Sequence, residues 1–205
     1  MTQRRSFSRE EPEIRRRALI EALLRCLAKH GHARSSVRTI AAEADVSPGL
    51  IRHHFGEKNQ LVVAAYRYLS DQLFNHISAA LDACPPDPRA RLRAFVKARF
   101  TAPVVSRDYV TAWLVLWGVA MTDPDIRTVH REVDEQYREL TGHLLRDIIG
   151  EAPDAREIGT LTREFTALLN GLWLEWSLSA DGLDPDVLSD MSLNFIDRTA
   201  VRELT

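Results

Sequence analysis

The stretch "SSVRTIAAEADVSPGLIRHHFGEKNQL", residues 35–61, limits the possible folds of this chain more than any other feature. It holds two short runs with apolar residues at helical spacing. The apolar positions are Val37, Ile40, Ala41 and Ala44 in the first run, and Ile51 and Phe55 in the second. Ser36 and Ser47 stand at expected N-caps, and Pro48 follows at a first helical position, where a missing N–H costs nothing. The stretch therefore predicts two short helices joined by the tight turn "ADV".

These two helices follow a longer predicted helix, residues 12–30, which Gly31 ends. Three helices in this order, with a short turn between the last two, make a helix-turn-helix unit. The residues expected to form its small core are Ile40, Ala41, Val46, Ile51 and Phe55. In such a unit the last helix enters the major groove of DNA with its N-terminal residues. We therefore expect the exposed groups of the second short helix to face DNA.

The residue types on this surface suit DNA binding. Small residues at the start of the helix let its backbone approach DNA, Leu50 can touch a thymine methyl group, and Arg52 can reach a guanine edge or a phosphate. Phosphates also favour helix N-termini. The predicted DNA-binding residues are Ser36, Arg38, Ser47, Pro48, Gly49, Leu50, Arg52, His53, His54 and Lys58.

Two alternatives stay open for this segment. The first is a pair of surface helices with solvated charges. The second is a metal site, whose ligands would be His30, His32, His53 and His54. That site lacks carboxylate or thiolate ligands at a suitable spacing.

The charge of the chain is unevenly distributed. Residues 1–60 contain 12 Lys and Arg against 7 Asp and Glu, whereas residues 61–205 contain 15 against 22. Residues 12–60 alone keep 9 basic against 5 acidic groups, so the excess does not come only from the N-terminal tail. A basic end on an acidic body is typical of a protein that meets a polyanion with one end.

The rest of the chain also predicts helices, so the expected fold class is all-α. The expected helices cover 57–83, a stretch up to about 100, 106–121, 124–149, 154–180 and 185–202. Breaking segments such as "CPPDP" at 84–88 separate them. The first residues are charged and lack an apolar stretch, so we expect no secretory signal, and no apolar run is long enough to cross a membrane. Its two cysteines have no metal-ligand spacing and suit a reducing cytoplasm, where we expect the protein to act.

The segment "SSVRTIAAEADVSPGLIRHHFGEKNQLVVAAYRYL" resembles the N-terminal signature of the TetR family of one-component repressors. The resemblance implies an all-helical homodimer in which residues 1–56 bind a palindromic operator in double-stranded DNA. Residues 57–205 would then form the helical ligand-binding and dimerisation domain. The family usually has aromatic residues at positions 52 and 54. This chain has Arg52 and His54 there, and both side chains can bond phosphate.

The four tryptophans form two pairs, each on one face of a predicted helix. Aromatic faces beside a carboxylate can bind a quaternary ammonium group. The predicted ligand-binding residues are Asp108, Tyr109, Trp113, Trp117, Asn170, Trp173 and Trp176. Tryptophans at helical spacing are more often part of core or interface packing.

Two body segments are similar to the choline-responsive repressors of this family. They are "TAWLVLWGVAMTDPDIRTVHREVDEQYRELTGHLL" and "FTALLNGLWLEWSLSADGLDPDVL". The similarity implies that the small-molecule effector is choline or a related quaternary ammonium compound. A family member with an unrelated effector is the alternative.

The helices expected at 154–180 and 185–202 have apolar residues on more than one face. We expect part of these faces to meet a second subunit in a four-helix interface. The predicted interface residues are Phe165, Leu168, Leu174, Leu178, Leu188, Met191 and Phe195. The alternative is that all of them pack within one chain.

Two further classes of protein compete with a ligand-responsive repressor. One is an enzyme acting on a small ester or amine. The sequence offers no nucleophile–base pair with supporting spacing and no phosphate loop. An acid–base cluster could be formed by Asp123, Asp125, His130 and Glu132, but Asp123 and Pro124 are better explained by helix capping. The other is a DNA-binding module without a ligand. No cofactor is expected.

Overall fold

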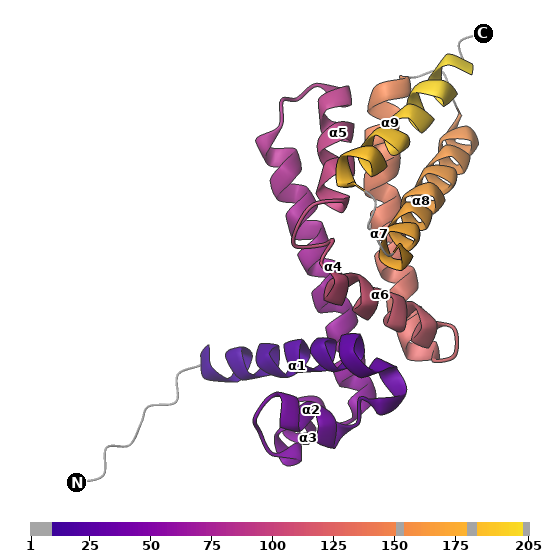
Figure 1. Cartoon of the computed structure of the whole chain (residues 1–205). Coiled ribbons are helices and arrows are strands. Elements are labelled where there is room, and N and C mark those ends of the chain that lie inside the picture. Colours follow the sequence, from indigo (N-terminus) through magenta and orange to yellow (C-terminus); the bar gives the residue numbers. More distant parts are fainter. Residues whose placement is uncertain (1–9, 151–153, 180–183, 203–205) are drawn as a thin grey trace. The chain divides into compact units, whose positions relative to one another are not determined.

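The computed structural model describes residues 10–150, 154–179 and 184–202, and the regular structure in these ranges is entirely helical (Figure 1). The helices are α1 Glu10–Arg34, α2 Val37–Glu43, α3 Pro48–Phe55, α4 Lys58–Ala83, α5 Pro88–Arg99, α6 Arg107–Ala120, α7 Pro124–Ile149, α8 Ala155–Leu178 and α9 Pro185–Arg202. The predicted all-α class is confirmed. In the described part of the chain no helix is long and apolar enough to cross a membrane.

The chain folds into two compact units. Unit 1 comprises Met1–Leu69 and Thr111–Val129, and unit 2 comprises Ser70–Val110 and His130–Thr205. The sequence predicted a division at residue 56, whereas the compact units divide within helices. Helices α4, α6 and α7 each begin in one unit and end in the other, so three continuous helices connect the two units.

The helix-turn-helix of unit 1 forms as the sequence predicts. The Ser36 hydroxyl caps α2 by accepting the Thr39 N–H at 3.1 Å. The turn that follows closes through the Val46 N–H, which donates to the Ala41 carbonyl at 2.9 Å, and through Asp45, whose φ is 53°. Asp tolerates this left-handed backbone better than most residues. The turn thus fixes how α3 follows α2.

A small apolar core and one ion-pair cluster hold α1, α2 and α3 together. Four of the five expected core residues are buried, and Val46 is half-buried. Glu43 of α2 pairs with two bases of α1, Arg25 at 2.8 Å and Lys29 at 3.1 Å. Their hydrogen bonds lower the pKa of the Glu43 carboxyl. Exposed ion pairs of this kind add little stability, so the apolar core carries most of it.

Unit 2 is built from capped helices around an aromatic core. Asp87 caps α5, and Asp154 caps α8 in a capping box with Glu157. Helix α9 packs against both α5 and α8, and on the α8 side Phe165 and Phe195 stack with ring centroids 6.2 Å apart. The segment between the helices predicted at 124–149 and 154–180 includes residues 151–153, which lie outside the described residues.

Candidate nucleic-acid interface and effector region

Helix α3 presents most of the predicted DNA-binding residues on the surface of unit 1. The exposed ones are Ser36, Arg38, Ser47, Pro48, Gly49, Arg52 and His53, whereas Leu50, His54 and Lys58 are half-buried. Ser47 caps α3 without a side-chain hydrogen bond, so its hydroxyl is not used by the helix. The Arg52 side chain makes no hydrogen bond or ion pair within the described residues. Both groups are therefore available to a ligand.

A groove of about 810 Å³ lies along α3 and the start of α4. Its lining consists of Val37, Pro48, Gly49, Ile51, Arg52, Gly56, Glu57 and Lys58. Four of these residues belong to the predicted DNA-binding set. Gly56, which ends α3, has a φ of 72° and lets the chain turn from α3 into α4 at the edge of the groove.

Lys58 begins α4 and is anchored at its tip. Its ammonium group donates to the His32 carbonyl at 3.3 Å, near the C-terminal end of α1, where a positive charge is favourable. Burial lowers the pKa of Lys58. Burial and the neighbouring Lys58 charge lower the pKa of His32 as well. Lys58 is therefore held in position at the edge of the groove.

The end of α3 is held by a residue that sequence reasoning missed. Arg16 of α1 donates to the His54 carbonyl at 3.0 Å, and its guanidinium lies over the Phe55 ring at 4.3 Å. The pKa of His54 is lowered, chiefly by burial and then by the neighbouring His53 and Arg16. A neutral His54 ring can still donate one hydrogen bond to phosphate, but it brings no full charge.

Replacing Arg16 with glutamine is expected to loosen α3 without removing a predicted DNA contact. The change removes the stacked guanidinium and the hydrogen bond to the α3 terminus, at a cost of about 1 kcal/mol in unfolding free energy. Urea denaturation would measure it. Arg17→Gln is the matched control, because the exposed Arg17 on the same helix pairs with Glu21 at 2.9 Å and lies over the Tyr68 ring at 5.6 Å, so it makes both kinds of contact without touching α3. Equal stability of the Arg16 variant and the native chain would contradict the assigned role.

The predicted ligand-binding residues are divided between the two units. In unit 1, Trp113 and Trp117 lie with ring centroids 6.2 Å apart, and Tyr66 meets Trp113 edge-on at 5.0 Å. The i,i+4 spacing predicted the first of these contacts. Trp113 is buried and Trp117 half-buried, so this cluster contributes to the packing of unit 1.

The second aromatic cluster lies in unit 2. Tyr109 meets Trp173 edge-on at 6.1 Å, and Arg99 donates to Asn170 at 3.1 Å beside them. The predicted carboxylate, Asp108, is exposed, and Trp176 is half-buried. Sequence reasoning missed Arg99, which lies at the end of a basic helix whose other charged residues are not buried. The structure thus brings three predicted residues of unit 2 together around an unpredicted cation.

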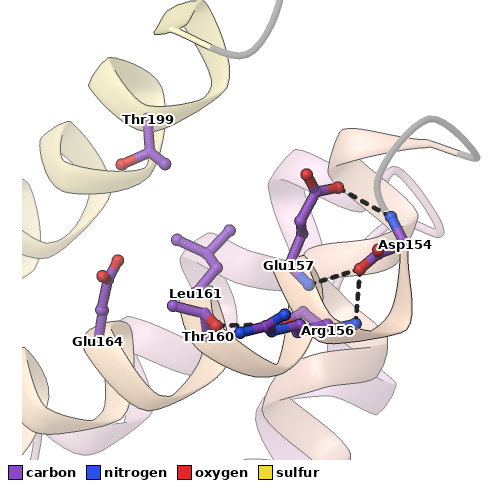
Figure 2. A pocket seen from close by; sticks show the side chains of 7 residues that line it. All are labelled: Asp154, Arg156, Glu157, Thr160, Leu161, Glu164 and Thr199. Carbon is purple, nitrogen blue, oxygen red and sulfur yellow. Dashed lines mark hydrogen bonds between the residues drawn. The ribbon is translucent and has the colours of Figure 1, made fainter.

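A pocket of about 460 Å³ at the start of α8 has a different character (Figure 2). Its lining is Asp154, Arg156, Glu157, Thr160, Leu161, Glu164 and Thr199. The Asp154 and Glu157 carboxylates accept backbone N–H groups of the capping box, as the dashed lines show. None of the predicted ligand-binding residues lines this pocket, and two of its three acidic groups, Asp154 and Glu157, cap the N-terminus of α8.

The predicted dimer residues differ in exposure. Leu174, Leu178 and Met191 are exposed, together with Val187, which the sequence did not single out. Leu168 and Phe195 are half-buried. Phe165 and Leu188 are buried within the single chain and serve its core. Large exposed apolar side chains on neighbouring helices are typical of an interaction surface.

The fold and the α3 surface define a helix-turn-helix transcriptional regulator with a helical body. Residues 19–65 match the family "Bacterial regulatory proteins, tetR family", and residues 88–201 match "BetI-type transcriptional repressor, C-terminal". The chain belongs to the TetR family of transcriptional repressors, with a C-terminal domain of the BetI type.

Individual relatives agree with this assignment. The regulator BetI of Pseudomonas paraeruginosa is 33% identical over 192 residues, covering 93% of this chain and 95% of the relative. BetI of Burkholderia mallei is 31% identical, covering 91% and 93%. A transcriptional regulator of Pseudomonas aeruginosa PAO1 matches with a TM-score of 0.86 and 36% identity, covering 98% and 97%. A regulator of Saccharomonospora viridis solved with choline shares the fold, with a TM-score of 0.78 and 24% identity over 90% and 96%.

Proposed function

We propose that this repressor works as a homodimer that binds a palindromic operator and is controlled by a small effector. The observation that carries the proposal is the groove along α3, where Arg52 and Lys58 stand beside the small residues Pro48 and Gly49. In a two-fold symmetric dimer, each α3 would enter the major groove of one half-site. The excess of basic groups in residues 12–60 supports the same orientation on a polyanion.

The effector would bind in the helical body. The BetI-type domain and the choline complex of the S. viridis regulator support an effector with a compact trimethylammonium head or one of the same shape. The tryptophans of the body supply aromatic faces that suit such a head. The protein would thus act by binding and not by catalysis, as other regulators of its family do.

The effector would control DNA binding through the helices that run through both units. Because α4, α6 and α7 are continuous between units 1 and 2, a ligand that prefers one arrangement of the body also biases the position of α3. The shift is limited by the difference in the effector's affinity for the two arrangements. We propose that effector binding lowers operator affinity.

Selection of binding sites from random-sequence DNA duplexes tests the proposal, because it yields the operator sequence and its symmetry together. We expect enrichment of palindromes whose half-sites are separated by about one helical turn, 34–36 Å, or a multiple of it. Affinity for the selected site should fall steeply with salt, since phosphate contacts release counterions. Enrichment of no sequence, or of single half-sites bound by one protomer, would contradict the proposal.

A further inference from the structure

Arg99 is a buried cation in unit 2. It is the last residue of α5 and only 5% exposed. Its guanidinium donates to the neutral amide oxygen of Asn170 at 3.1 Å, and no ion pair among the described residues includes it. Removing a charge from water is costly unless an opposite charge compensates it. The protein therefore holds a positive charge whose natural complement is an anion.

The rings of Tyr137 and Trp173 already make cation–π contacts with the Arg99 guanidinium. The guanidinium carbon lies 4.5 Å from the centroid of the Tyr137 ring and 6.0 Å from that of Trp173. These are the distances at which a ring attracts a cation. A bare quaternary ammonium at the same rings would meet Arg99 as a like charge, which disfavours it.

Two buried hydroxyl groups, one on α7 and one on α8, lack a hydrogen-bond acceptor among the described residues. Tyr137 of α7 is 5% exposed. Its hydroxyl oxygen lies beside the Arg99 guanidinium, which can donate to it, and its own O–H group has no acceptor among the described residues. The second is the Thr166 hydroxyl, one turn before Asn170 on the same face of α8. A buried polar group without a partner is costly in a folded protein. An acceptor arriving with a ligand would satisfy the Tyr137 hydroxyl.

We propose that the effector carries a carboxylate, which pairs with the Arg99 guanidinium and accepts a hydrogen bond from the Tyr137 hydroxyl, while its apolar or quaternary head packs against Tyr109. A carboxylate matches the planar donor fork of arginine. The proposal rests on the proposed function, because it names the ligand class of the same body. A carboxylate-bearing effector would distinguish this chain from a regulator that binds a cation without a carboxylate, such as choline. The rival role for Arg99 is a structural link from α5 to α8 through Asn170.

Four probes distinguish recognition of a carboxylate from recognition of a quaternary ammonium cation. They are glycine betaine, choline, and the isosteres of each in which a tert-butyl group replaces the trimethylammonium group. Thermal unfolding of the full-length protein is measured against each probe, because a ligand of the folded state raises the midpoint with its concentration. We expect both carboxylates to raise the midpoint, with at least about tenfold tighter binding than the matching alcohols. Choline binding as well as glycine betaine, or no response to either carboxylate, would overturn the proposal.

Two variants test the assigned atoms. Asn170→Asp places an internal carboxylate beside Arg99, so it should raise the unliganded midpoint and weaken carboxylate binding by about tenfold or more. Tyr137→Phe removes only the hydroxyl and should weaken carboxylate binding by about tenfold. Asn194→Asp makes the same chemical change at an exposed site of α9 and serves as the control.

The results also distinguish a failure of the carboxylate proposal from a failure of the proposed repressor function. Carboxylate affinity unchanged in both variants would assign Arg99 to the structural role and overturn the ligand class. Operator binding of the unliganded native protein is measured in parallel, and it depends on unit 1. Loss of operator binding would therefore count against the proposed repressor mechanism, whereas loss of carboxylate selectivity would count only against this inference.

Discussion

Replacing Arg52 with alanine is expected to weaken operator binding by about 1–3 kcal/mol, or roughly fivefold to 150-fold per protomer. Arg52 is exposed on α3, lines the groove beside Pro48 and Gly49, and makes no side-chain hydrogen bond within the described residues. Its guanidinium is thus free to bind a guanine edge or a phosphate. Fluorescence anisotropy on the selected operator duplex would measure the loss, and the unfolding free energy should stay within about 0.5 kcal/mol.

The salt dependence of this variant tells which DNA group Arg52 contacts. If it binds a phosphate, the slope of log affinity against log salt falls by about 1 for each lost contact, and all sequences are weakened alike. If it binds a base edge, the preference at one position relaxes. Arg93→Ala is the matched control, because it removes an exposed arginine from unit 2. Equal operator affinity of the Arg52 and Arg93 variants would show that α3 does not bind DNA as assigned.

Local sequence signals predicted the helices well because several helix starts carry their own capping chemistry. Ser36 before α2 and Asp123 before α7 are capping residues, and their side chains accept backbone N–H groups in the structure. Pro48 and Pro124 stand at first helical positions, where proline is favoured. The exposure of Arg52 followed from the same local pattern, since its neighbour Ile51 faces the core.

The body could be predicted less well, since its contacts join distant parts of the chain. Arg99 and Asn170 are 71 residues apart, so nothing in the α5 sequence marks the last of its basic residues as buried. Arg16 and His54 are separated by 38 residues in the same way. The pattern of α6 placed its aromatic residues on one helix, yet it could not show that Tyr109 belongs to unit 2 and Trp113 to unit 1. Helical spacing determines a face and does not determine what packs against it.

Replacing both Leu178 and Met191 with glutamate is expected to give a monomer. These side chains are 72% and 47% exposed in the single chain, on α8 and α9. If they meet a second subunit, a glutamate at each position would bury four unpaired charges in a symmetric dimer, which strongly disfavours association. Sedimentation at micromolar concentration would detect the change in mass. The helix content and unfolding of the isolated chain should remain close to native, because neither side chain belongs to the core.

The monomer should also bind the palindromic operator more than about a hundredfold more weakly, since the second half-site is no longer bound intramolecularly. Met121→Glu is the control for the charge change, because Met121 is 78% exposed in unit 1. That variant is expected to sediment as the native protein does. A double variant that sediments as a dimer would place the interface elsewhere. A monomer that keeps full affinity for the palindrome would separate dimerisation from operator recognition and contradict the proposed symmetric docking of two α3 helices.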